Sequence, residues 1–309
     1  MKDALAGAEA ILREGCGDRV HVDLTMAPLT TFRIGGPAAL YLEPETEADL
    51  AAASRAVVET EIPYIVIGKG SNLLVSDRGF PGLVLRLGRG YRWVARDGNR
   101  LTAGAAMPLP ALAGVALQHG LAGLAFGVAI PATVGGAVRM NAGAHDGSMA
   151  DVIDSVEVFR LLAGATESIA ASEIRFAYRH SSLPDDGVVC ATTVDLVPGD
   201  PGVIRAAMDE ARDWRRRTQP LAEPNCGSVF KNPQGDHAAR LIEATGLKGH
   251  SVGGAKVSTK HANFIVAGPE ARAADVLALI TEVQDSVERS SGVRLEREVH
   301  LVGAFDDAA

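Results

Sequence analysis

The chain has 309 residues, of which 47% are hydrophobic and 22% are charged. This length and composition predict a globular protein of two or three packed units and exclude extensive disorder away from the ends. The 30 basic and 38 acidic residues give a formal net charge of −8, which argues against a general affinity for nucleic acid or for an anionic membrane. Any phosphate group must therefore be bound by a local site.

The N-terminus and the cysteines indicate a cytoplasmic protein. Residues 1–20 carry acidic side chains and no continuous apolar core, so we expect no secretory signal. The longest apolar run, 121–130, is interrupted by glycine and is too short to cross a bilayer. Cys16, Cys190 and Cys226 are far apart and have no nearby histidine ligands, so we expect reduced thiols and no metal site.

The first third of the chain has a βαβ pattern. Residues 3–14 are predicted to form an amphipathic helix, and strands are predicted at 39–42 and 64–67. Between the two strands, Thr46 is predicted to cap a helix that has Asp49 at its third position.

The second of these strands ends in a glycine-rich loop, Gly68-Lys69-Gly70-Ser71-Asn72. The two glycines allow close approach of backbone N–H groups, and Ser71 and Asn72 add donors, so the loop is suited to bind a phosphate. It matches neither the Walker loop nor the dinucleotide fingerprint, whose third glycine is replaced here by Leu73. A turn that binds nothing is the alternative interpretation.

Residues 127–144 are the most glycine-dependent stretch, and little of it is expected to form a regular element. Repeated small residues let a large flat ligand or another backbone lie close, while Pro131 stiffens the start of the loop and Gly135-Gly136 make it tight. Close packing between two subdomains is the alternative. We favour a ligand.

The remaining elements alternate between strands and helices. Strands are predicted at 83–87, 91–96, 100–103, 155–161 and 188–196, and helices at 109–119 and 202–217. After a boundary at Gln219-Pro220, a smaller α/β unit is predicted with helices at 237–245 and 271–290 and strands at 263–267 and 293–303. Alternation in the last strand places Leu295, Arg297, Val299 and Leu301 on one face and Glu296, Glu298 and His300 on the other.

The stretch 225–233 concentrates polar chemistry. Within nine residues it carries a hydroxyl, an ammonium and two amides, on Ser228, Lys231, Asn225 and Asn232. An ordinary turn is the alternative, since these residue types also occur in loops. Because Val229 and Phe230 lie between the polar groups, we expect the segment to enter the protein and to present Ser228 next to buried surface.

Taken in order, these motifs resemble those of the bacterial UDP-N-acetylenolpyruvoylglucosamine reductases (UDP-N-acetylmuramate dehydrogenases), the flavoenzymes of early peptidoglycan synthesis. The matching motifs are Gly68–Asn72, Pro-x-Thr-Val-Gly-Gly-Ala…Met-Asn-Ala-Gly at 131–143, Tyr178-Arg179, Gly-Ser-Val-Phe-Lys-Asn-Pro at 227–233, His-Ala-Asn-Phe-Ile at 261–265 and Leu-Glu-Arg-Glu-Val at 295–299. Six motifs agree in order and spacing over nearly the whole chain.

The resemblance implies an α+β protein. It implies a two-part FAD-binding region of the vanillyl-alcohol-oxidase (PCMH) type at 1–218, split near 90–105, and a C-terminal α/β substrate-binding domain at 219–309. FAD would be bound non-covalently, and NADPH would be the hydride donor. The positions that correspond to the FAD-binding loops are Gly68, Lys69, Gly70, Ser71, Asn72, Pro131, Thr133, Gly135, Gly136, Asn141 and Gly143.

The resemblance also assigns catalytic roles to Arg179, Ser228 and Glu298. Hydride from reduced flavin N5 would add to the terminal carbon of the enolpyruvyl C=C bond and leave enolate-like charge on the carbon next to the carboxylate, which protonation would convert to the CH–CH group of the product. Arg179 is permanently cationic and suited to stabilise that charge. Glu298 would orient this cation or, if protonated, donate to the substrate carboxylate, and Ser228 would protonate the α-carbon.

The substrate implied by the resemblance is a UDP-sugar, UDP-N-acetylglucosamine enolpyruvate. Its expected contacts are Tyr178, Arg216, Lys231, Asn232 and His261. Longer members of the family insert a Tyr-bearing loop between the Arg and Ser motifs, but only 228 − 179 = 49 positions separate them here, so the chain resembles the shorter class. Ala132 also stands where many members have glycine.

The implied oxidoreductase is a cytoplasmic monomer that serves cell wall biogenesis, and through it cell shape, the cell cycle and cell division. Two other hypotheses stay open. An oxidase of the same flavin fold would return electrons to oxygen, and a flavin-binding module would bind FAD without responding to NADPH. A purely structural protein would leave the glycine-rich stretches unexplained.

Overall fold

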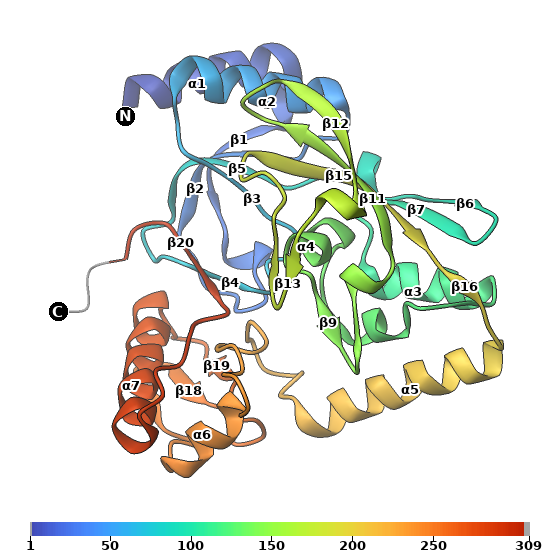
Figure 1. Cartoon of the computed structure of the whole chain (residues 1–309). Helices are drawn as coiled ribbons and strands as arrows, with labels where there is room; N and C mark the ends of the chain where they lie inside the picture. Colours follow the sequence, from blue (N-terminus) through green and yellow to red (C-terminus); the bar gives the residue numbers. More distant parts are fainter. Residues whose placement is uncertain (1, 306–309) are drawn as a thin grey trace. The chain divides into compact units, whose positions relative to one another are not determined.

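The computed structural model describes residues 2–305 and contains two compact units (Figure 1). The first unit comprises 2–22, 39–69 and 82–214, and the second comprises 23–38, 70–81 and 215–305. The chain therefore passes between the units several times, and the second unit contains two segments from the N-terminal third.

The predicted helices all form. They are α1 (Lys2–Cys16), α2 (Glu47–Thr60), α3 (Leu109–Gln118), α5 (Pro201–Thr218), α6 (Ala238–Ala244) and α7 (Ala273–Ser291). The start of α2 follows the predicted cap: the Asp49 N–H donates to Thr46 Oγ1, and the Asp49 carboxylate accepts the Thr46 N–H. This reciprocal pairing satisfies two backbone donors that a helix start leaves unpaired.

One expectation for 127–144 is wrong, because α4 (Val134–Arg139) forms within it. Thr133 caps the helix by accepting the Gly136 N–H at 3.3 Å. Val134, Ala137 and Val138 are buried, so packing outweighs the low helix propensity of the two glycines.

A four-stranded sheet with helices α1 and α2 forms the first layer of the first unit. Its strand order is β1 (Val20–Thr25), β2 (Pro37–Leu42), β5 (Phe80–Leu85), β3 (Tyr64–Val66), with β3 and β5 parallel. The helices lie side by side in Figure 1. A Cβ on Gly15 would lie 2.8 Å from the Cβ of Ala52, so glycine allows this close contact. Leu12, Leu50 and Leu83 are fully buried in the core between them.

A five-stranded antiparallel sheet forms the second layer. Its order is β12 (Ala165–Ala170), β11 (Ile153–Arg160), β15 (Gly187–Asp195), β7 (Arg100–Gly104), β6 (Val94–Asp97). Its core includes Leu112, Val134 and Val156 from α3, α4 and β11. The strand predicted at 91–96 begins later, because Arg89–Tyr91 form a 3₁₀ turn whose Gly90 N–H donates to Glu45.

Three two-stranded antiparallel pairs complete the first unit. Two are hairpins, β9 (Gly143–Ala144) with β10 (Gly147–Ser148) and β13 (Phe176–Ala177) with β14 (His180–Ser181), and the third pairs the distant strands β8 (Leu121–Ala122) and β16 (Val197–Pro198).

The second unit has its own core around α6 and α7. Its sheet has the order β17 (Ser251–Val252), β18 (Ala255–Val257), β19 (Ile265–Ala267), and β20 (His300–Val302) pairs in parallel with β4 (Leu73–Val75). The regular strand predicted at 293–303 is thus confined to β20. Leu295 and Val299 are buried but Arg297 is exposed, so the predicted alternation of faces holds only in part.

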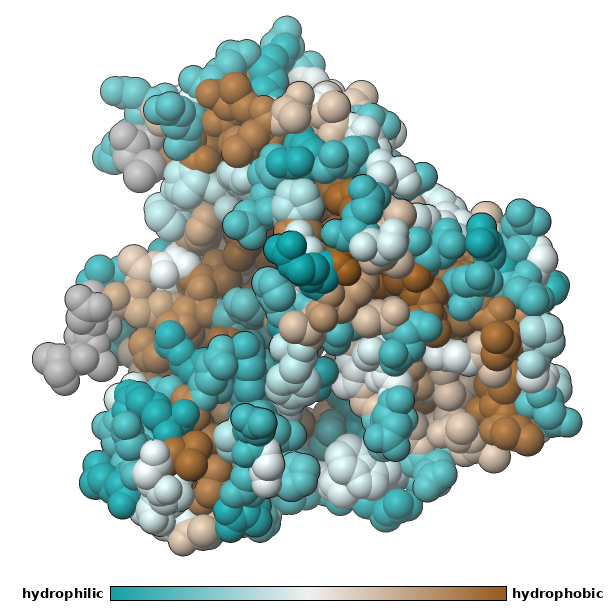
Figure 2. Space-filling view, in the orientation of Figure 1, coloured by the Kyte–Doolittle hydropathy of each residue, from teal (hydrophilic) through white to brown (hydrophobic). Residues whose placement is uncertain are grey.

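Figure 2 shows hydrophilic residues over much of the visible face, with hydrophobic residues in separate groups between them. Most large hydrophobic side chains instead belong to the three cores. Within residues 2–305, no helix is both long and apolar enough to cross a membrane.

Candidate active site

A cavity of about 360 Å³ lies in the first unit next to β3 and α4. Its lining includes residues 64–68 from β3 and the loop after it, and Thr133, Gly135 and Gly136 from the start of α4. Four residues predicted to bind FAD therefore line one cavity, although they come from two distant parts of the sequence.

The glycines at this cavity allow close backbone approach. A Cβ on Gly68 would lie 2.5 Å from Thr133 Oγ1, and a Cβ on Gly135 would lie 2.9 Å from the Cβ of Ala105. Any larger residue at either position would force Thr133 or Ala105 to shift. Gly135, which lies in the stretch 127–144, is therefore closely packed, and both glycines also line the cavity.

The other residues predicted to bind FAD lie elsewhere. Gly70, Ser71 and Asn72 belong to the second unit. There the Gly70 carbonyl accepts the Thr31 N–H at 3.1 Å, and the Asn72 amide donates to the Glu298 carbonyl at 3.0 Å. The four others, Lys69, Pro131, Asn141 and Gly143, belong to the first unit but not to the lining of this cavity.

Arg179 is at the turn of the β13–β14 hairpin in the first unit. Its φ of +57° lies in the left-handed region, which is uncommon for a residue with a side chain. Its Nη1 donates to the Gly143 carbonyl at 3.2 Å, and its guanidinium lies 5.0 Å from the centre of the Tyr178 ring. The Asn141 amide donates to the Ala177 carbonyl at 3.0 Å. These contacts bring four of the predicted site residues together, namely Tyr178, Arg179, Asn141 and Gly143.

The Ser228 segment enters the core of the second unit, as the sequence predicts. Val229 and Phe230 are buried, while Ser228 is half-buried. The buried Asn263 amide binds both backbone groups of Phe230, accepting its N–H at 2.9 Å and donating to its carbonyl at 2.8 Å. The segment is therefore held by an asparagine whose role the sequence did not reveal, although it lies inside the His261–Ile265 motif.

Glu298 lies beside this segment. The Glu298 N–H donates to the Val229 carbonyl at 2.8 Å, and Phe230 forms a β-bridge with Arg297. Next to them, Lys231 Nζ contacts Glu296 Oε1 at 2.6 Å. Two predicted catalytic residues, Ser228 and Glu298, thus belong to adjacent backbone segments of one unit.

Three further residues predicted to bind substrate also belong to the second unit. The Arg216 carbonyl accepts a hydrogen bond from Lys260 Nζ at 2.6 Å. Asn232 Oδ1 accepts the Ala238 N–H at 3.1 Å. Burial lowers the pKa of His261, and its Nδ1 accepts the Asn263 N–H at 3.3 Å, which leaves Nε2 to carry the proton of the neutral ring.

Comparison with known proteins identifies both parts of the chain. The model of the FAD binding domain matches residues 38–166, and the model of the UDP-N-acetylenolpyruvoylglucosamine reductase C-terminal domain matches residues 219–302. The reductase of Moorella thermoacetica is 46% identical over 300 residues, which cover 97% of this chain and 98% of the relative. This chain belongs to the UDP-N-acetylenolpyruvoylglucosamine reductase family.

Other members of the reductase family are similar over comparable lengths. The reductase of Anaeromyxobacter sp. strain Fw109-5 is 46% identical over 283 residues, covering 92% of this chain and 88% of the relative. The crystal structure of the reductase from Thermus caldophilus has a TM-score of 0.82 and 40% identity, covering 92% of this chain and 99% of that chain. The resemblance based on six motifs is confirmed, as are the α+β fold and the FAD-binding domain.

The cavity fits part of an FAD molecule. Its volume is at the lower end of the usual range for ligand pockets, about 300–1,000 Å³. The glycines let backbone N–H groups approach a diphosphate, and Arg86, Arg92 and Arg139 line the same cavity. Among residues 2–305, no cluster of three or more His, Cys, Asp or Glu side chains could hold a metal ion.

Sequence reasoning missed much of this lining. Arg86 and Arg92 belong to no motif, and Asp185 follows a proline in an ordinary-looking turn. The single available signal was the position of Arg139 inside the Pro131–Gly143 motif. The others become visible when the fold brings β3, α4 and the turn before β15 together.

Proposed function

We propose that this chain is an NADPH-dependent flavoenzyme that reduces UDP-N-acetylglucosamine enolpyruvate to UDP-N-acetylmuramate. The observation that carries the proposal is the pairing of the Ser228 and Glu298 segments in the second unit, through the Glu298 N–H and the Val229 carbonyl. This pairing gives a hydroxyl donor and a carboxylate on adjacent backbone, next to a buried core.

FAD is the proposed cofactor, and it supplies hydride transfer when bound. Its proposed binding residues are Gly68, Lys69, Gly70, Ser71, Asn72, Pro131, Thr133, Gly135, Gly136, Asn141 and Gly143. The cavity with its glycine-rich walls supports this assignment for Gly68, Thr133, Gly135 and Gly136.

Arg179 is proposed to stabilise the negative charge that develops beside the substrate carboxylate. A guanidinium remains charged at any working pH and offers paired N–H donors to a carboxylate. Because the Gly143 carbonyl and the Tyr178 ring already hold it, little reorganisation is needed during reaction. Glu298 would orient Arg179 or, if protonated, donate to the carboxylate.

Ser228 is proposed to donate the proton that completes the reduction. A hydroxyl is a weak acid, so it needs re-protonation from a neighbour, and Lys231 and Asn232 follow it in the same segment. The UDP part of the substrate is proposed to contact Tyr178, Arg216, Lys231, Asn232 and His261.

The division of labour along the chain follows from these roles. Residues 1–218 are proposed to form the FAD-binding region and 219–309 the substrate-binding domain. The product is a peptidoglycan precursor, so the proposed setting is the cytoplasm, where the protein would act as a monomer.

A two-step anaerobic experiment tests this function. NADPH is added to the purified protein while the visible flavin absorbance is followed, and the enolpyruvyl UDP-sugar is then added. Rapid return of the oxidised spectrum on addition of the sugar is the expected result. Reduced flavin that persists until air is admitted would instead indicate an oxidase, and flavin that NADPH does not reduce would indicate a binding module.

The Ser228→Ala variant tests the catalytic assignment. Reoxidation by the substrate should slow by roughly 10²–10⁴-fold, because the proton donor is lost, whereas NADPH should still reduce the flavin at the wild-type rate. An equal loss in both half-reactions would contradict the role of Ser228.

A further inference from the structure

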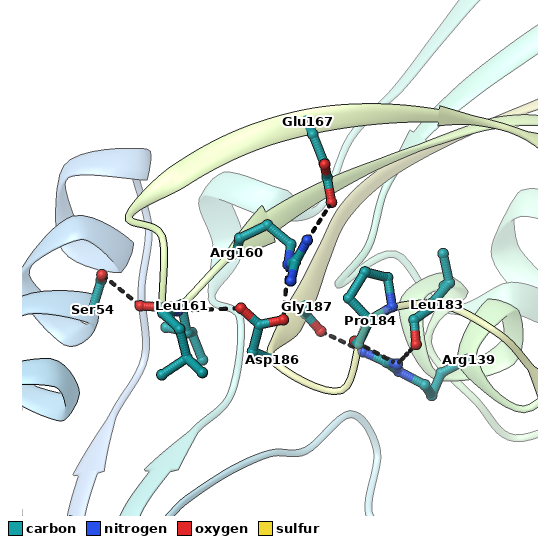
Figure 3. Close-up of polar contacts among 10 residues, drawn as sticks. Ser54, Arg139, Arg160, Leu161, Glu167, Leu183, Pro184, Asp186 and Gly187 are labelled. Carbon is teal, nitrogen blue, oxygen red and sulfur yellow. Dashed lines mark hydrogen bonds and ion pairs between the residues drawn. The ribbon is translucent and has the colours of Figure 1, made fainter. Parts of the chain in front are cut away.

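The partly buried guanidinium of Arg139 holds one wall of the cavity in place. Its Nη1 donates to the carbonyls of Leu183 and Pro184 at 3.0 and 2.9 Å, and its Nη2 donates to the Gly187 carbonyl at 2.5 Å (Figure 3). Within residues 2–305 no carboxylate forms an ion pair with it. Burial lowers the pKa of Arg139, and the nearby charges of Asp185 and Asp186 oppose this shift. Arg139 therefore fixes the turn 183–187 through carbonyl dipoles.

A second arginine fixes the same turn from the other side. Arg160 Nε donates to Asp186 Oδ1 at 2.8 Å, and the Leu162 N–H donates to Asp186 Oδ2 at 3.3 Å. The Asp186 carbonyl also accepts the Leu161 N–H at 3.0 Å, and Ser54 of α2 donates to the Leu161 carbonyl at 2.6 Å. Figure 3 shows the two guanidinium groups on either side of the turn. These contacts and the burial of Leu183, Asp186 and Gly187 hold the turn on both sides of the exposed Asp185.

Asp185 lies between these two anchors and lines the cavity. Its side chain is exposed, and among residues 2–305 its carboxylate makes neither a hydrogen bond nor an ion pair. The negative charge of Asp185 acts on two neighbouring groups. It opposes the lowering of the Arg139 pKa by burial, and it adds to the effects of burial and Asp186 that raise the pKa of Tyr64. The fold therefore holds an unused hydrogen-bond acceptor at a fixed place on the cavity wall.

We propose that Asp185 is a cofactor-binding residue that accepts hydrogen bonds from the ribose hydroxyls in the adenosine half of FAD, and that Arg139 and Asp186 position it. This inference rests on the proposed function, because it takes FAD as the ligand. A carboxylate has two acceptor oxygens and matches a vicinal diol, as in dinucleotide-binding folds that place an acidic residue on the ribose.

The cavity favours the adenosine half over the flavin half. Its size suits part of the cofactor, and Arg86 and Arg92 offer guanidinium planes that can stack on an adenine ring. The glycines Gly68, Gly135 and Gly136 lie on the same cavity and suit the adjoining diphosphate. The ribityl chain of the flavin half also carries hydroxyls, so the test must separate the two halves.

The test uses whole protein from which flavin has been removed, and measures dissociation constants for FAD, riboflavin, ADP and 2′-deoxy-ADP by calorimetry. The variants are Asp185→Asn, which preserves shape, and Asp97→Asn, an exposed carboxylate in the β6–β7 hairpin, as the matched control. Asp185→Asn should raise the dissociation constants of FAD and ADP by about tenfold or more, because hydrogen bonds to a charged group are lost. Riboflavin binding and the control should be unchanged.

The deoxy ligand gives the decisive comparison. Wild-type protein should prefer ADP to 2′-deoxy-ADP, and Asp185→Asn should abolish that preference. The assignment would be overturned if both proteins preferred ADP to 2′-deoxy-ADP equally, or if Asp185→Asn weakened the binding of riboflavin alone. Arg139→Met should weaken ADP binding and preserve the far-UV circular dichroism, and unaltered ADP binding in this variant would overturn the positioning role.

Failure of the proposed function has a different signature. If wild-type protein binds FAD and ADP but NADPH and the enolpyruvyl sugar do not cycle the flavin, the proposed reductase fails while the Asp185 site stands. If cycling occurs and Asp185→Asn binds ADP normally, the reductase stands and the Asp185 site fails.

Discussion

Replacing Asn263 by alanine should release the Ser228 segment from the core of the second unit. The Asn263 side chain is 4% exposed and makes two hydrogen bonds, of 2.9 and 2.8 Å, to the N–H and the carbonyl of Phe230. Phe230 itself is 1% exposed, so water cannot readily replace the lost partners. The alanine variant therefore leaves two buried backbone groups without hydrogen bonds.

The expected loss follows from the number of groups affected. Each buried polar group left without a partner costs about 1–3 kcal/mol, so two groups cost about 2–6 kcal/mol. With an m-value of about 2 kcal/mol/M, typical for urea, the unfolding midpoint should fall by about 1 M or more. Asn263→Asp should lower the unfolding midpoint at least as much, because aspartate keeps one acceptor but buries a charge next to the Phe230 carbonyl.

Urea unfolding followed by far-UV circular dichroism measures this change. Tryptophan fluorescence would report mainly on the first unit, since Trp93 and Trp214 both belong to it. Asn99→Ala, in the exposed turn between β6 and β7, is the matched control and should shift the midpoint little. A midpoint for Asn263→Ala that equals the control would refute the reasoning.

The same variant should separate the two half-reactions. Misplacing Ser228 should slow flavin reoxidation by the enolpyruvyl sugar by at least tenfold, because small displacements of a reacting group are costly. Reduction of the flavin by NADPH should be unaffected.

Three other predictions rest on separate features. Gly70→Ala should lower the thermal unfolding temperature more than Gly98→Ala. Both glycines have positive φ, which costs alanine roughly 1–2 kcal/mol. Only at Gly70 would the new Cβ also lie 2.2 Å from a backbone carbonyl oxygen. Burial opposes ionisation of Asp49, but hydrogen bonds from Arg19 and two backbone N–H groups outweigh it and lower its pKa. The contribution of the Asp49 carboxylate to folding stability is complete above about pH 4, near its pKa in the unfolded chain, and is lost as pH falls toward its pKa in the folded protein. Between pH 4 and pH 3 the urea midpoint of Asp49→Asn should therefore fall less than that of the wild type. Burial raises the pKa of Cys16 to about 11 and that of Cys190 to about 12, and it also raises the pKa of Cys226. At pH 8 a disulfide reagent should therefore modify no thiol in the native protein and all three thiols in denaturant.

The sequence predicted local structure well where one residue decides a helix or strand boundary. Thr46 and Asp49 fix the start of α2 through a pairing that spans only three residues, so the pattern is complete in the sequence. The start of α4 has the same kind of cap at Thr133, yet it was missed because two glycines follow it. Packing of Val134 and Val138 in the core decides that helix, and burial is a property of the whole fold.

The sequence singles out a candidate site residue only where that residue lies in a short motif. Ser228 and Glu298 each belong to a motif, and their backbone pairing followed once the second unit formed. Asp185 and Arg86 belong to no motif, because a carboxylate or a guanidinium acquires a role only from what faces it across a cavity. The sequence also could not predict which segments make up the second unit, because residues 23–38 and 70–81 belong to it although they are far from 215–305 in the sequence.

The C-terminal end of α4 links the cofactor cavity to the Arg179 hairpin. The Arg139 side chain holds the turn 183–187, while its own carbonyl accepts the hydroxyl of the buried Ser181 at 2.8 Å, which belongs to β14. Arg179 occupies a left-handed conformation that costs roughly 1–2 kcal/mol, and such a residue persists only where its surroundings hold it. Because one residue anchors both the cavity wall and the strand after Arg179, flavin binding that further stabilises this wall should also stabilise the hairpin. Hydrogen exchange at the Ser181 amide should therefore slow when FAD binds, and equal exchange with and without FAD would show that the two regions are independent.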